Sequence, residues 1–524
     1  MPNPGKLIPN YVAASVALSF AGILNGLDTG AIGAIVHMDQ FTGTFGQLSP
    51  STVGWTVSIV MLTGIVPALL GGQIADRKGR LYVVFPGAVL FALGAILQMS
   101  AFSLGQFITG RAIAGAGQGA FYSNISVYIT EIAPQRSRGR LASLPQFMAA
   151  LGVCLGYFGC FCTASVESSM AWRLPYILQI CVALMLALVC RSLPESPRWL
   201  VLHGRGEEAV QAVRLLNFNM DEATRDFLTP QPQENLSSWQ SFRTLFRRAY
   251  LPRTLLSLFI LSMAQLSGID AINYYAPTLF VQTGIATTKT AIIAAGVAAV
   301  AMFIASIPGF VCIDKWGRRT CTLVGGSILC GIMLLIGSLY AAGAVRETGA
   351  ARWVVVVSVF LFGIVFCATW GIVSKIYASE IQPSHTRAAG NSVGMAFSFF
   401  TNWFVSFITP ILLSSSAYNA YFFFGALNLF GVAIFALYMP ETRGRSLEQI
   451  QSDFASPNLS ALRNLFGRRV ARFASASPQD GRSSASSMEL TDREPAAAAA
   501  TPASHSSTIQ LTSSAVRGAS LSLA

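Results

Sequence analysis

The sequence predicts an all-α membrane protein with twelve transmembrane helices arranged in two six-helix halves. Three observations support this fold class: an apolar composition, twelve apolar segments of membrane-spanning length, and an internal repeat of charged motifs. Of the 524 residues, 53% are hydrophobic and 11% are charged, whereas ordinary soluble domains carry about 25% charged residues. A chain of this length and composition cannot hide its apolar surface in one water-soluble core.

Twelve segments approach or exceed the length of about 20 residues that a helix needs to cross a bilayer. They lie near 11–36, 53–72, 81–101, 105–131, 141–162, 174–193, 253–281, 290–312, 320–343, 353–378, 388–411 and 419–439. The first segment is too long for the apolar region of a cleaved signal peptide, so we interpret it as the first helix.

Basic residues are concentrated on one side of the predicted bundle. The even-to-odd loops contain Arg77, Lys78, Arg80, Arg136, Arg138, Arg140, Lys315, Arg318, Arg319 and Arg387, whereas the opposite loops contain Arg173, Lys289, Arg346 and Arg352. Because cytoplasmic loops are enriched in Lys and Arg, both termini are predicted to be cytoplasmic. The same rule explains the net charge of +12 without a nucleic-acid partner.

The expected organisation has four parts. These are an N-terminal half at 1–193, a cytoplasmic linker with short helices at 194–252, a C-terminal half at 253–439 and a cytoplasmic tail at 440–524. The linker has a helical pattern from Glu207 to Leu216, and the Ser/Ala-rich tail beyond about residue 470 is predicted to be disordered. The nine cysteines lie in or beside apolar runs without metal-ligand spacing, so no metal or cofactor is expected.

Three pairs of loop motifs recur in the same order in the two halves, roughly 240 residues apart. The segment Gly72-Gln-Ile-Ala-Asp-Arg-Lys-Gly-Arg80 matches Asp314-Lys-Trp-Gly-Arg-Arg319, Glu131-Ile-Ala-Pro134 matches Glu380-Ile-Gln-Pro383, and Pro194-Glu-Ser-Pro-Arg198 matches Pro440-Glu-Thr-Arg443. Three ordered pairs indicate two repeated halves with a binding site at their interface.

The acids and bases of these motifs lie at the predicted cytoplasmic ends of helices. They are Asp76, Arg80, Glu131, Arg138, Glu195 and Arg198 in the first half, and Asp314, Arg318, Glu380, Arg387 and Glu441 in the second. We expect ion pairs among them to tie the halves together in an outward-facing state. The alternative is charge that only fixes orientation, but acids contribute little to topology.

Two charged residues lie at membrane depth, where ionisable groups are functional candidates. Asp28 is in the first predicted helix and Arg111 in the fourth. At 1.5 Å per residue, Asp28 lies about 12 Å and Arg111 about 9 Å below the same surface, so the two side chains can meet. A static buried ion pair is the alternative to a functional one.

Several longer motifs carry a resemblance to a known family. They are Pro194-Glu-Ser-Pro-Arg-Trp-Leu200, Gln265-Leu-Ser-Gly268 with Tyr274-Tyr-Ala-Pro277, and Pro440-Glu-Thr-Arg-Gly-Arg-Ser-Leu-Glu448. Over about residues 10–450 the chain resembles the sugar porter family of the major facilitator superfamily, and its composition and Ser-rich tail are similar to those of fungal hexose and quinate permeases.

The resemblance implies alternating-access transport of a sugar or sugar-like solute, such as a hexose, pentose, polyol or quinate-like compound. It implies a monomer in the lipid bilayer of the plasma membrane, without enzyme activity. It also implies that Asp28 binds a proton beside Arg111, and therefore proton-coupled symport. An uncoupled sugar facilitator and a transporter-like nutrient sensor remain as alternatives.

The resemblance also implies a solute site, in which amides and carboxylates bind hydroxyl groups and an aromatic side chain packs on the ring. The matching positions are Gln146, Gln265, Asp270, Tyr274, Trp370 and Asn402. Gly268 is expected to let the seventh helix unwind beside this site.

The sequence departs from the family pattern at several of these positions. Asp270 replaces the usual asparagine, Ala264 replaces a second glutamine, and Trp370-Gly-Ile372 is followed by Lys375 instead of a further tryptophan. The site is therefore expected to contain one additional acid. If Gln265 and Trp370 lie at the same depth, helix geometry places Asp270 about 15 Å from Lys375, too far for direct pairing.

Overall fold

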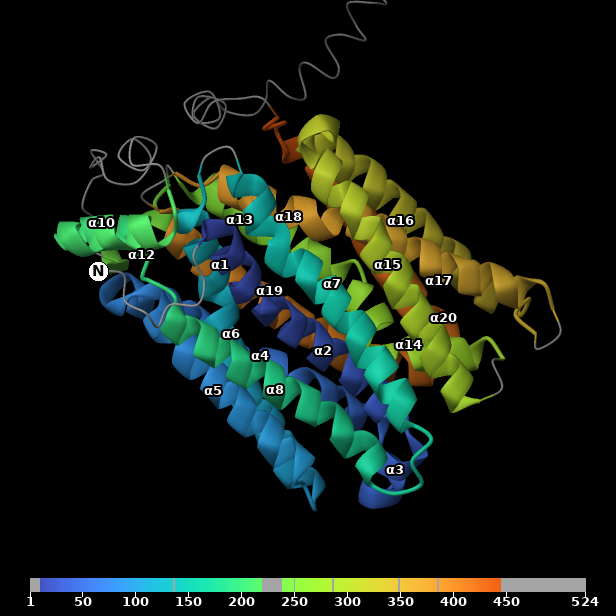
Figure 1. The fold of residues 1–524 in the computed structure, drawn as a ribbon. Coiled ribbons are helices and arrows are strands. Elements are labelled where there is room, and N and C mark those ends of the chain that lie inside the picture. Colours follow the sequence, from blue (N-terminus) through green and yellow to red (C-terminus); the bar gives the residue numbers. More distant parts are fainter. Residues whose placement is uncertain are drawn as a thin grey trace, which may run out of the picture. The chain divides into compact units, whose positions relative to one another are not determined.

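The computed structural model describes residues 10–134, 137–218, 238–248, 250–284, 287–346, 349–383 and 386–443. Within these residues the chain is almost entirely helical, and the helices run roughly along one another in a bundle (Figure 1). The tail from residue 444 onward, including the part predicted to be disordered, lies outside the described residues.

The first half contains six predicted spans and one short additional helix. Its helices are α1 (Tyr11–Leu18), α2 (Phe20–Ile35), α3 (Asp39–Phe45), α4 (Pro50–Lys78), α5 (Arg80–Met99), α6 (Leu104–Ile132), α7 (Arg138–Thr163) and α8 (Met170–Ser192). In the linker the structure has α9 (Pro197–Leu202), α10 (Gly206–Leu215) and α12 (Ser238–Leu245). The helical pattern predicted near Glu207 is therefore confirmed as α10.

The second half repeats the arrangement. Its helices are α13 (Leu251–Leu266), α14 (Ile269–Gln282), α15 (Thr288–Trp316), α16 (Arg318–Ala341), α17 (Ala351–Ala368), α18 (Trp370–Glu380), α19 (Arg387–Ser415) and α20 (Ala417–Tyr438). Each predicted span coincides with one helix or with a consecutive pair, namely α1–α2, α13–α14 and α17–α18. The twelve-helix prediction is confirmed, and the ends differ by a few residues.

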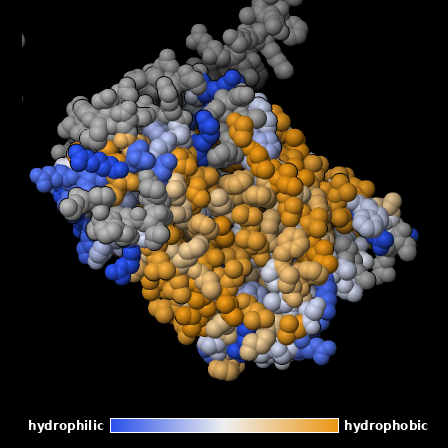
Figure 2. Space-filling view, viewed as in Figure 1, coloured by the Kyte–Doolittle hydropathy of each residue, from blue (hydrophilic) through white to orange (hydrophobic). Residues whose placement is uncertain are grey.

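The lengths and apolar compositions of the helices are those of membrane-spanning segments. Eleven helices or helix pairs in the described chain are long and apolar enough to cross a membrane, and Figure 2 shows a broad apolar surface with hydrophilic residues toward two ends. The remaining span, α6, has 29 residues and contains several polar side chains. Its Arg111 and Gln118 are fully buried and Asn124 is 1% exposed, so these groups face protein rather than lipid.

Small residues bring α2 and α7 into backbone contact. Gly22, Gly26 and Gly30 recur every four residues along α2 and face α7. A Cβ atom at Gly26 would lie 2.0 Å from the carbonyl oxygen of Ala149, so no larger residue fits there. Membrane helices associate through such small-residue faces, and this one fixes α7 beside the helix that contains Asp28.

The seventh span is interrupted at Gly268, as expected. This glycine has φ +94° and separates α13 from α14. A left-handed conformation of this kind strains residues that have a Cβ atom. Asp270 therefore lies in the first turn of a new helix, at a membrane depth where an interrupted backbone is tolerated because it borders a cavity.

Candidate functional site

A cavity of about 140 Å³ lies between the two halves, about ten times the ~10–15 Å³ that a single water molecule requires. Helices α2, α6 and α7 of the first half contribute to its wall, as do α13, α14, α18 and α19 of the second. Its polar side chains include Asn25, Thr29, Tyr122, Gln146, Gln265, Asp270, Asn273, Tyr274, Lys375 and Asn402. The interface of the repeated halves is therefore hollow and hydrogen-bonding, as the internal repeat predicted.

Five of the six expected solute-binding residues line this cavity. They are Gln146, Gln265, Asp270, Tyr274 and Asn402. The side chains of Asp270, Tyr274 and Asn402 are almost fully buried, with 8%, 1% and 6% exposure. The structure thus assembles residues from α7, α13, α14 and α19 around one space.

Two acceptor atoms of α14 are buried without a hydrogen-bond partner among the described residues. They are Oδ2 of Asp270 and Oδ1 of Asn273, and both residues line the cavity. Buried acceptors without donors are costly. A hydroxyl-rich solute would supply the missing donors, because each hydroxyl group donates one hydrogen bond.

Trp370, the sixth expected solute-binding residue, is not among the residues that line the cavity in this structure. Its indole N–H donates to the carbonyl oxygen of Thr322 at 2.8 Å, and its ring packs edge-on against Phe435. Gly326 leaves the room that the indole fills inside the second half. Helix α18 begins at Trp370, and the next residue, Gly371, faces the cavity instead.

Lys375 extends from α18 across the interface of the halves. Its ammonium group donates to the hydroxyl of Tyr122 at 3.2 Å and to Oε1 of Gln146, and it lies 5.0 Å from the centre of the Tyr122 ring. The ion pairs of the described part of the chain include none between Lys375 and Asp270, so the two side chains do not pair directly there. Both residues nevertheless line the same cavity.

Asp28 and Arg111 form a bidentate ion pair, as their predicted depths in the membrane allowed. The Arg111 guanidinium donates to both carboxylate oxygens of Asp28, at 3.0 and 3.3 Å, and also to Oε1 of Gln98 and to the carbonyl oxygen of Val57. Exposure is 1% for Asp28 and 0% for Arg111. The neighbouring residue Thr29 lines the cavity, so the buried pair adjoins the solute space.

At the end of the bundle near α3, contacts join the halves close to the cavity. The hydroxyl of Tyr157 donates to the carbonyl oxygen of Asn273, and His37 Nε2 lies 2.7 Å from the hydroxyl of Thr278. Burial lowers the pKa of His37 to about 4. The imidazole is therefore neutral between pH 5 and 8, and this contact does not change its charge in that range.

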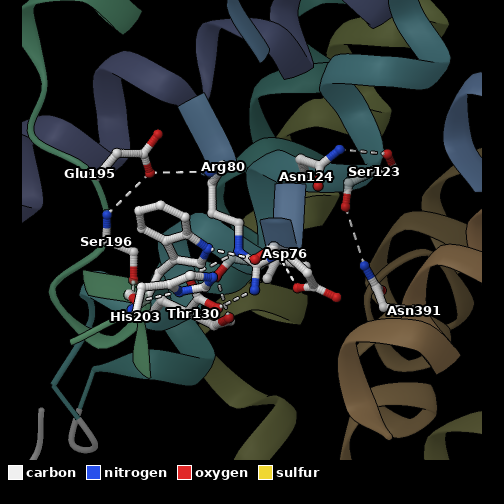
Figure 3. A network of polar contacts seen from close by, with 12 residues as sticks. Asp76, Arg80, Ser123, Asn124, Thr130, Glu195, Ser196, His203 and Asn391 are labelled. Carbon is white, nitrogen blue, oxygen red and sulfur yellow. Dashed lines mark hydrogen bonds and ion pairs between the residues drawn. The ribbon is translucent and has the colours of Figure 1, made fainter. Parts of the chain in front are cut away.

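At the other end, here called the charged end, one cluster gathers four of the expected gate residues of the first half. Arg80 forms ion pairs with Asp76 and with Glu131, the latter at 3.0 Å. Glu195 accepts a hydrogen bond from the backbone N–H group of Arg80 at 3.1 Å (Figure 3). It also accepts one from the backbone N–H group of Leu81 at 2.9 Å. Burial raises the pKa of Glu195, and these hydrogen bonds oppose that effect. The carboxylate thereby caps the N-terminus of α5.

The second half repeats this cap. Arg318 pairs with Glu380 at 2.9 Å, and Glu441 accepts from the backbone N–H groups of Arg318 and Arg319 at the start of α16. A glycine with positive φ precedes each capped helix, Gly79 at +112° and Gly317 at +83°. A Cβ atom there would lie within 3.0 Å of the capping carboxylate, which explains why glycine occupies both positions.

The expected ion pairs across the halves stay a prediction, because several of the residues concerned lie outside the described part. Each ion pair described for these clusters joins elements of the same half, because the motifs meet at the helix ends of their own repeat. Across the halves, Asn391 of α19 donates to the carbonyl oxygen of Ser123 at 3.3 Å (Figure 3). Arg198 is half-buried, and the side chains of Arg138, Asp314 and Arg387 lie outside the described part.

Removing the cap carboxylate should destabilise the first half. Glu195→Ala leaves two N–H groups of α5 without their acceptor, which costs about 1–3 kcal/mol. We expect a lower midpoint of thermal unfolding in detergent, measured by tryptophan fluorescence. Glu207→Ala removes an exposed acid from α10 and serves as the control. Equal midpoints for the two variants would contradict the capping role.

Some cavity residues could not be identified from motifs. Asn273 and Tyr122 lie in apolar helices outside every repeated motif, and their inward orientation depends on the break at Gly268 and on the rotation of α6. For Asn273 a signal existed, because it follows Asp270 by three residues and three-residue spacing places side chains on one helix face. Lys375 was visible as a departure from the family pattern, but its contacts were not.

Comparisons with known proteins agree with this geometry. The family model for "Sugar (and other) transporter" matches residues 14–454. The sugar transporter STL1 of Saccharomyces cerevisiae is 30% identical over 477 residues, covering 86% of this chain and 82% of the yeast protein. The MFS-type transporter criB of Aspergillus cristatus is 29% identical over 447 residues, covering 84% of this chain and 92% of that protein.

Solved structures show the same fold. The xylose transporter XylE from E. coli in a partially occluded inward-open conformation matches with a TM-score of 0.69 at 23% identity, covering 83% of this chain and 99% of that chain. A structure of the MFS proton:xylose symporter XylE bound to 6-bromo-6-deoxy-D-glucose matches with a TM-score of 0.71 at 24% identity. The chain is therefore a multi-pass membrane protein with a major facilitator fold, is not an enzyme, and belongs to the Sugar (and other) transporter family.

Proposed function

We propose that the protein carries a hydroxyl-rich, sugar-like solute through the cavity by alternating access, together with a proton. The main support is the cavity between the halves, in which Gln146, Gln265 and Asn402 provide amides and α14 provides two buried acceptors that need donors. A sugar ring with several hydroxyl groups matches this set. The proposed solute site thus comprises Gln146, Gln265, Asp270, Tyr274 and Asn402.

The proposal of proton coupling depends on Asp28 and Arg111. A buried carboxylate inside a membrane is costly and marks a functional site by default. Here it is paired with arginine, and Thr29 beside it faces the solute space. A movement of α2 within the first half can therefore act on both the solute space and the ion pair. The proton:xylose symporter named above has the same fold.

We also propose that the charged end faces the cytoplasm and that the membrane is the plasma membrane. The basic loops lie at that end, as cytoplasmic loops do. The proposed units are two six-helix halves at 1–193 and 253–439, acting in one monomer. The charged clusters would hold each half together while the halves rock against each other, and Arg138, Asp314, Arg198 and Arg387 remain proposed members of this gate.

Uptake into proteoliposomes tests the proposal. The purified full-length protein is reconstituted, and radiolabelled hexoses, pentoses, polyols and quinate are offered with and without an acid-outside pH gradient. Gradient-dependent accumulation that a protonophore abolishes supports symport. Equilibration without accumulation would indicate the uncoupled facilitator, and binding without movement would indicate a nutrient sensor.

Asp270 should affect affinity for a neutral solute directly. Charge-assisted hydrogen bonds are stronger than neutral ones, and the Asp270→Asn change replaces one acceptor by a donor. We expect the apparent KM for a neutral sugar to rise roughly tenfold, equivalent to ~1.5 kcal/mol. For an anionic solute the same variant should improve affinity at neutral pH, because a repelling charge is removed. An unchanged KM for every transported solute would exclude Asp270 from the site.

A further inference from the structure

The cavity contains two opposite charges that do not neutralise each other by direct contact. Among the described lining residues, the charged ones are Asp270 on α14 and Lys375 on α18. The ion pairs of the described chain include neither of them. Asp28 is the other acid near the cavity, and both of its carboxylate oxygens already accept hydrogen bonds from Arg111.

The groups that contact the ammonium of Lys375 directly are all neutral. The ammonium contacts the hydroxyl of Tyr122, the amide oxygen of Gln146 and the face of the Tyr122 ring. Ionisable groups at membrane depth pair with opposite charges or mark the path of a solute. An ammonium that lines the solute space and has neutral partners is therefore suited to an anionic group of the solute.

We propose that Lys375 binds the carboxylate of a polyhydroxylated acid and that this acid, rather than a neutral sugar, is the preferred solute. The inference deepens the proposed transport function and rests on it. A carboxylate adds Coulombic attraction to its hydrogen bond with Lys375, which the neutral groups of Tyr122 and Gln146 do not supply. The hydroxyl groups of the solute would then donate to Asp270 and Asn273, whose buried acceptor atoms have no other donor among the described residues.

The charge of Asp270 gives the solute one orientation. A carboxylate is repelled from Asp270 and attracted by Lys375, so the acid group of the solute faces α18 and its hydroxyl end faces α14. Because Tyr122 and Gln146 belong to the first half and Lys375 to the second, a carboxylate that captures Lys375 also weakens a contact between the halves. Lys375 would thus take part both in solute binding and in the contact that holds the two halves together.

The rival interpretation is that Asp270 compensates Lys375 across the cavity and leaves a site for neutral sugars. Two matched pairs of probes separate these possibilities. D-glucuronate differs from D-glucose by a carboxylate in place of a hydroxymethyl group, and quinate differs from its amide by a carboxylate in place of a carboxamide. Binding of each probe to the purified full-length protein is measured by calorimetric titration, and uptake by reconstituted vesicles.

We expect the wild-type protein to bind at least one of the two acids about tenfold more tightly than its neutral partner. Lys375→Met should reduce affinity for that acid by about tenfold or more and change affinity for the neutral partner by less than about threefold. Lys375→Arg should keep the preference, since it keeps the charge. Lys289→Met, which removes an exposed lysine at the start of α15, is the matched control and should behave like the wild type.

Other outcomes overturn the inference in distinguishable ways. If neutral sugars bind and move as well as the acids, and Lys375→Met leaves the ratio unchanged, anion recognition is wrong but sugar transport stands. If no probe binds or moves in the wild type, the proposed sugar-like solute is wrong as well. If Lys375→Met fails to fold, the Lys375→Gln variant and the ratio of acid to neutral affinity in the wild type test anion recognition instead.

Discussion

Replacing Asp28 by asparagine is expected to abolish uphill accumulation of the solute while leaving exchange across the membrane measurable. In the proposed cycle, a proton takes the place of Arg111 on the Asp28 carboxylate when helix movement separates the ion pair. Asparagine keeps the shape and one acceptor for Arg111 but cannot carry the proton. With one proton per solute, each unit of pH gradient can drive accumulation by about tenfold, and this driving force would be lost.

Two measurements distinguish lost coupling from lost structure. Accumulation is measured under an acid-outside gradient, and counterflow exchange is measured without a gradient, in the same vesicles. Loss of both in Asp28→Asn would identify the static buried pair, whose disruption typically costs ~3–5 kcal/mol. Undiminished accumulation would exclude Asp28 as the coupling residue. Asp39→Asn removes an exposed acid from α3 and should accumulate solute normally.

The second large effect is expected at the seam between α2 and α7. Gly26→Val places methyl groups where a Cβ atom alone already lies 2.0 Å from the carbonyl oxygen of Ala149. A backbone atom cannot avoid the clash by changing rotamer as a side chain can, so the two helices must separate. Overpacking of this kind costs at least ~1–3 kcal/mol. We expect the variant to lose most of its monodisperse, folded protein in detergent.

Size-exclusion chromatography of a fluorescent fusion measures this loss. Gly159→Val is the matched control, because Gly159 lies on α7 with no atom within 4 Å of an added Cβ. The control should elute as the wild type does. A folded Gly26→Val protein with normal elution would show that the seam can widen at little cost, and the close approach would then not be required for folding.

The fold could be predicted from the sequence more completely than the site. Apolar runs of bilayer length and the paired motifs are local signals, so every span was found within a few residues of its observed ends. The Asp28–Arg111 pair was also predictable, because helix rise converts sequence position into depth. Depth, however, does not determine the direction of a side chain around its helix axis.

Trp370 illustrates that limit. Its position in the family pattern indicated the cavity, but α18 starts at this residue and its indole fills the space left by Gly326 in the second half. The charged motifs illustrate another limit. Residues such as Arg80 and Glu131 share one depth with partners in both halves, so the sequence could not decide between pairs within a half and pairs across the halves. Packing decides this, and packing depends on contacts far apart in sequence.

The paired caps at Glu195 and Glu441 have a kinetic consequence. Because the described charges of each cap are satisfied inside their own half, they need not be dehydrated or rehydrated when the halves part at the charged end. Among the described hydrogen bonds near that end, the one from Asn391 to Ser123 crosses between the halves and is neutral, worth about 0.5–1.5 kcal/mol. The caps themselves should therefore add little to the barrier for the return of the empty carrier. The slow step of the transport cycle is then expected where α14 must withdraw from Tyr157 to readmit solute.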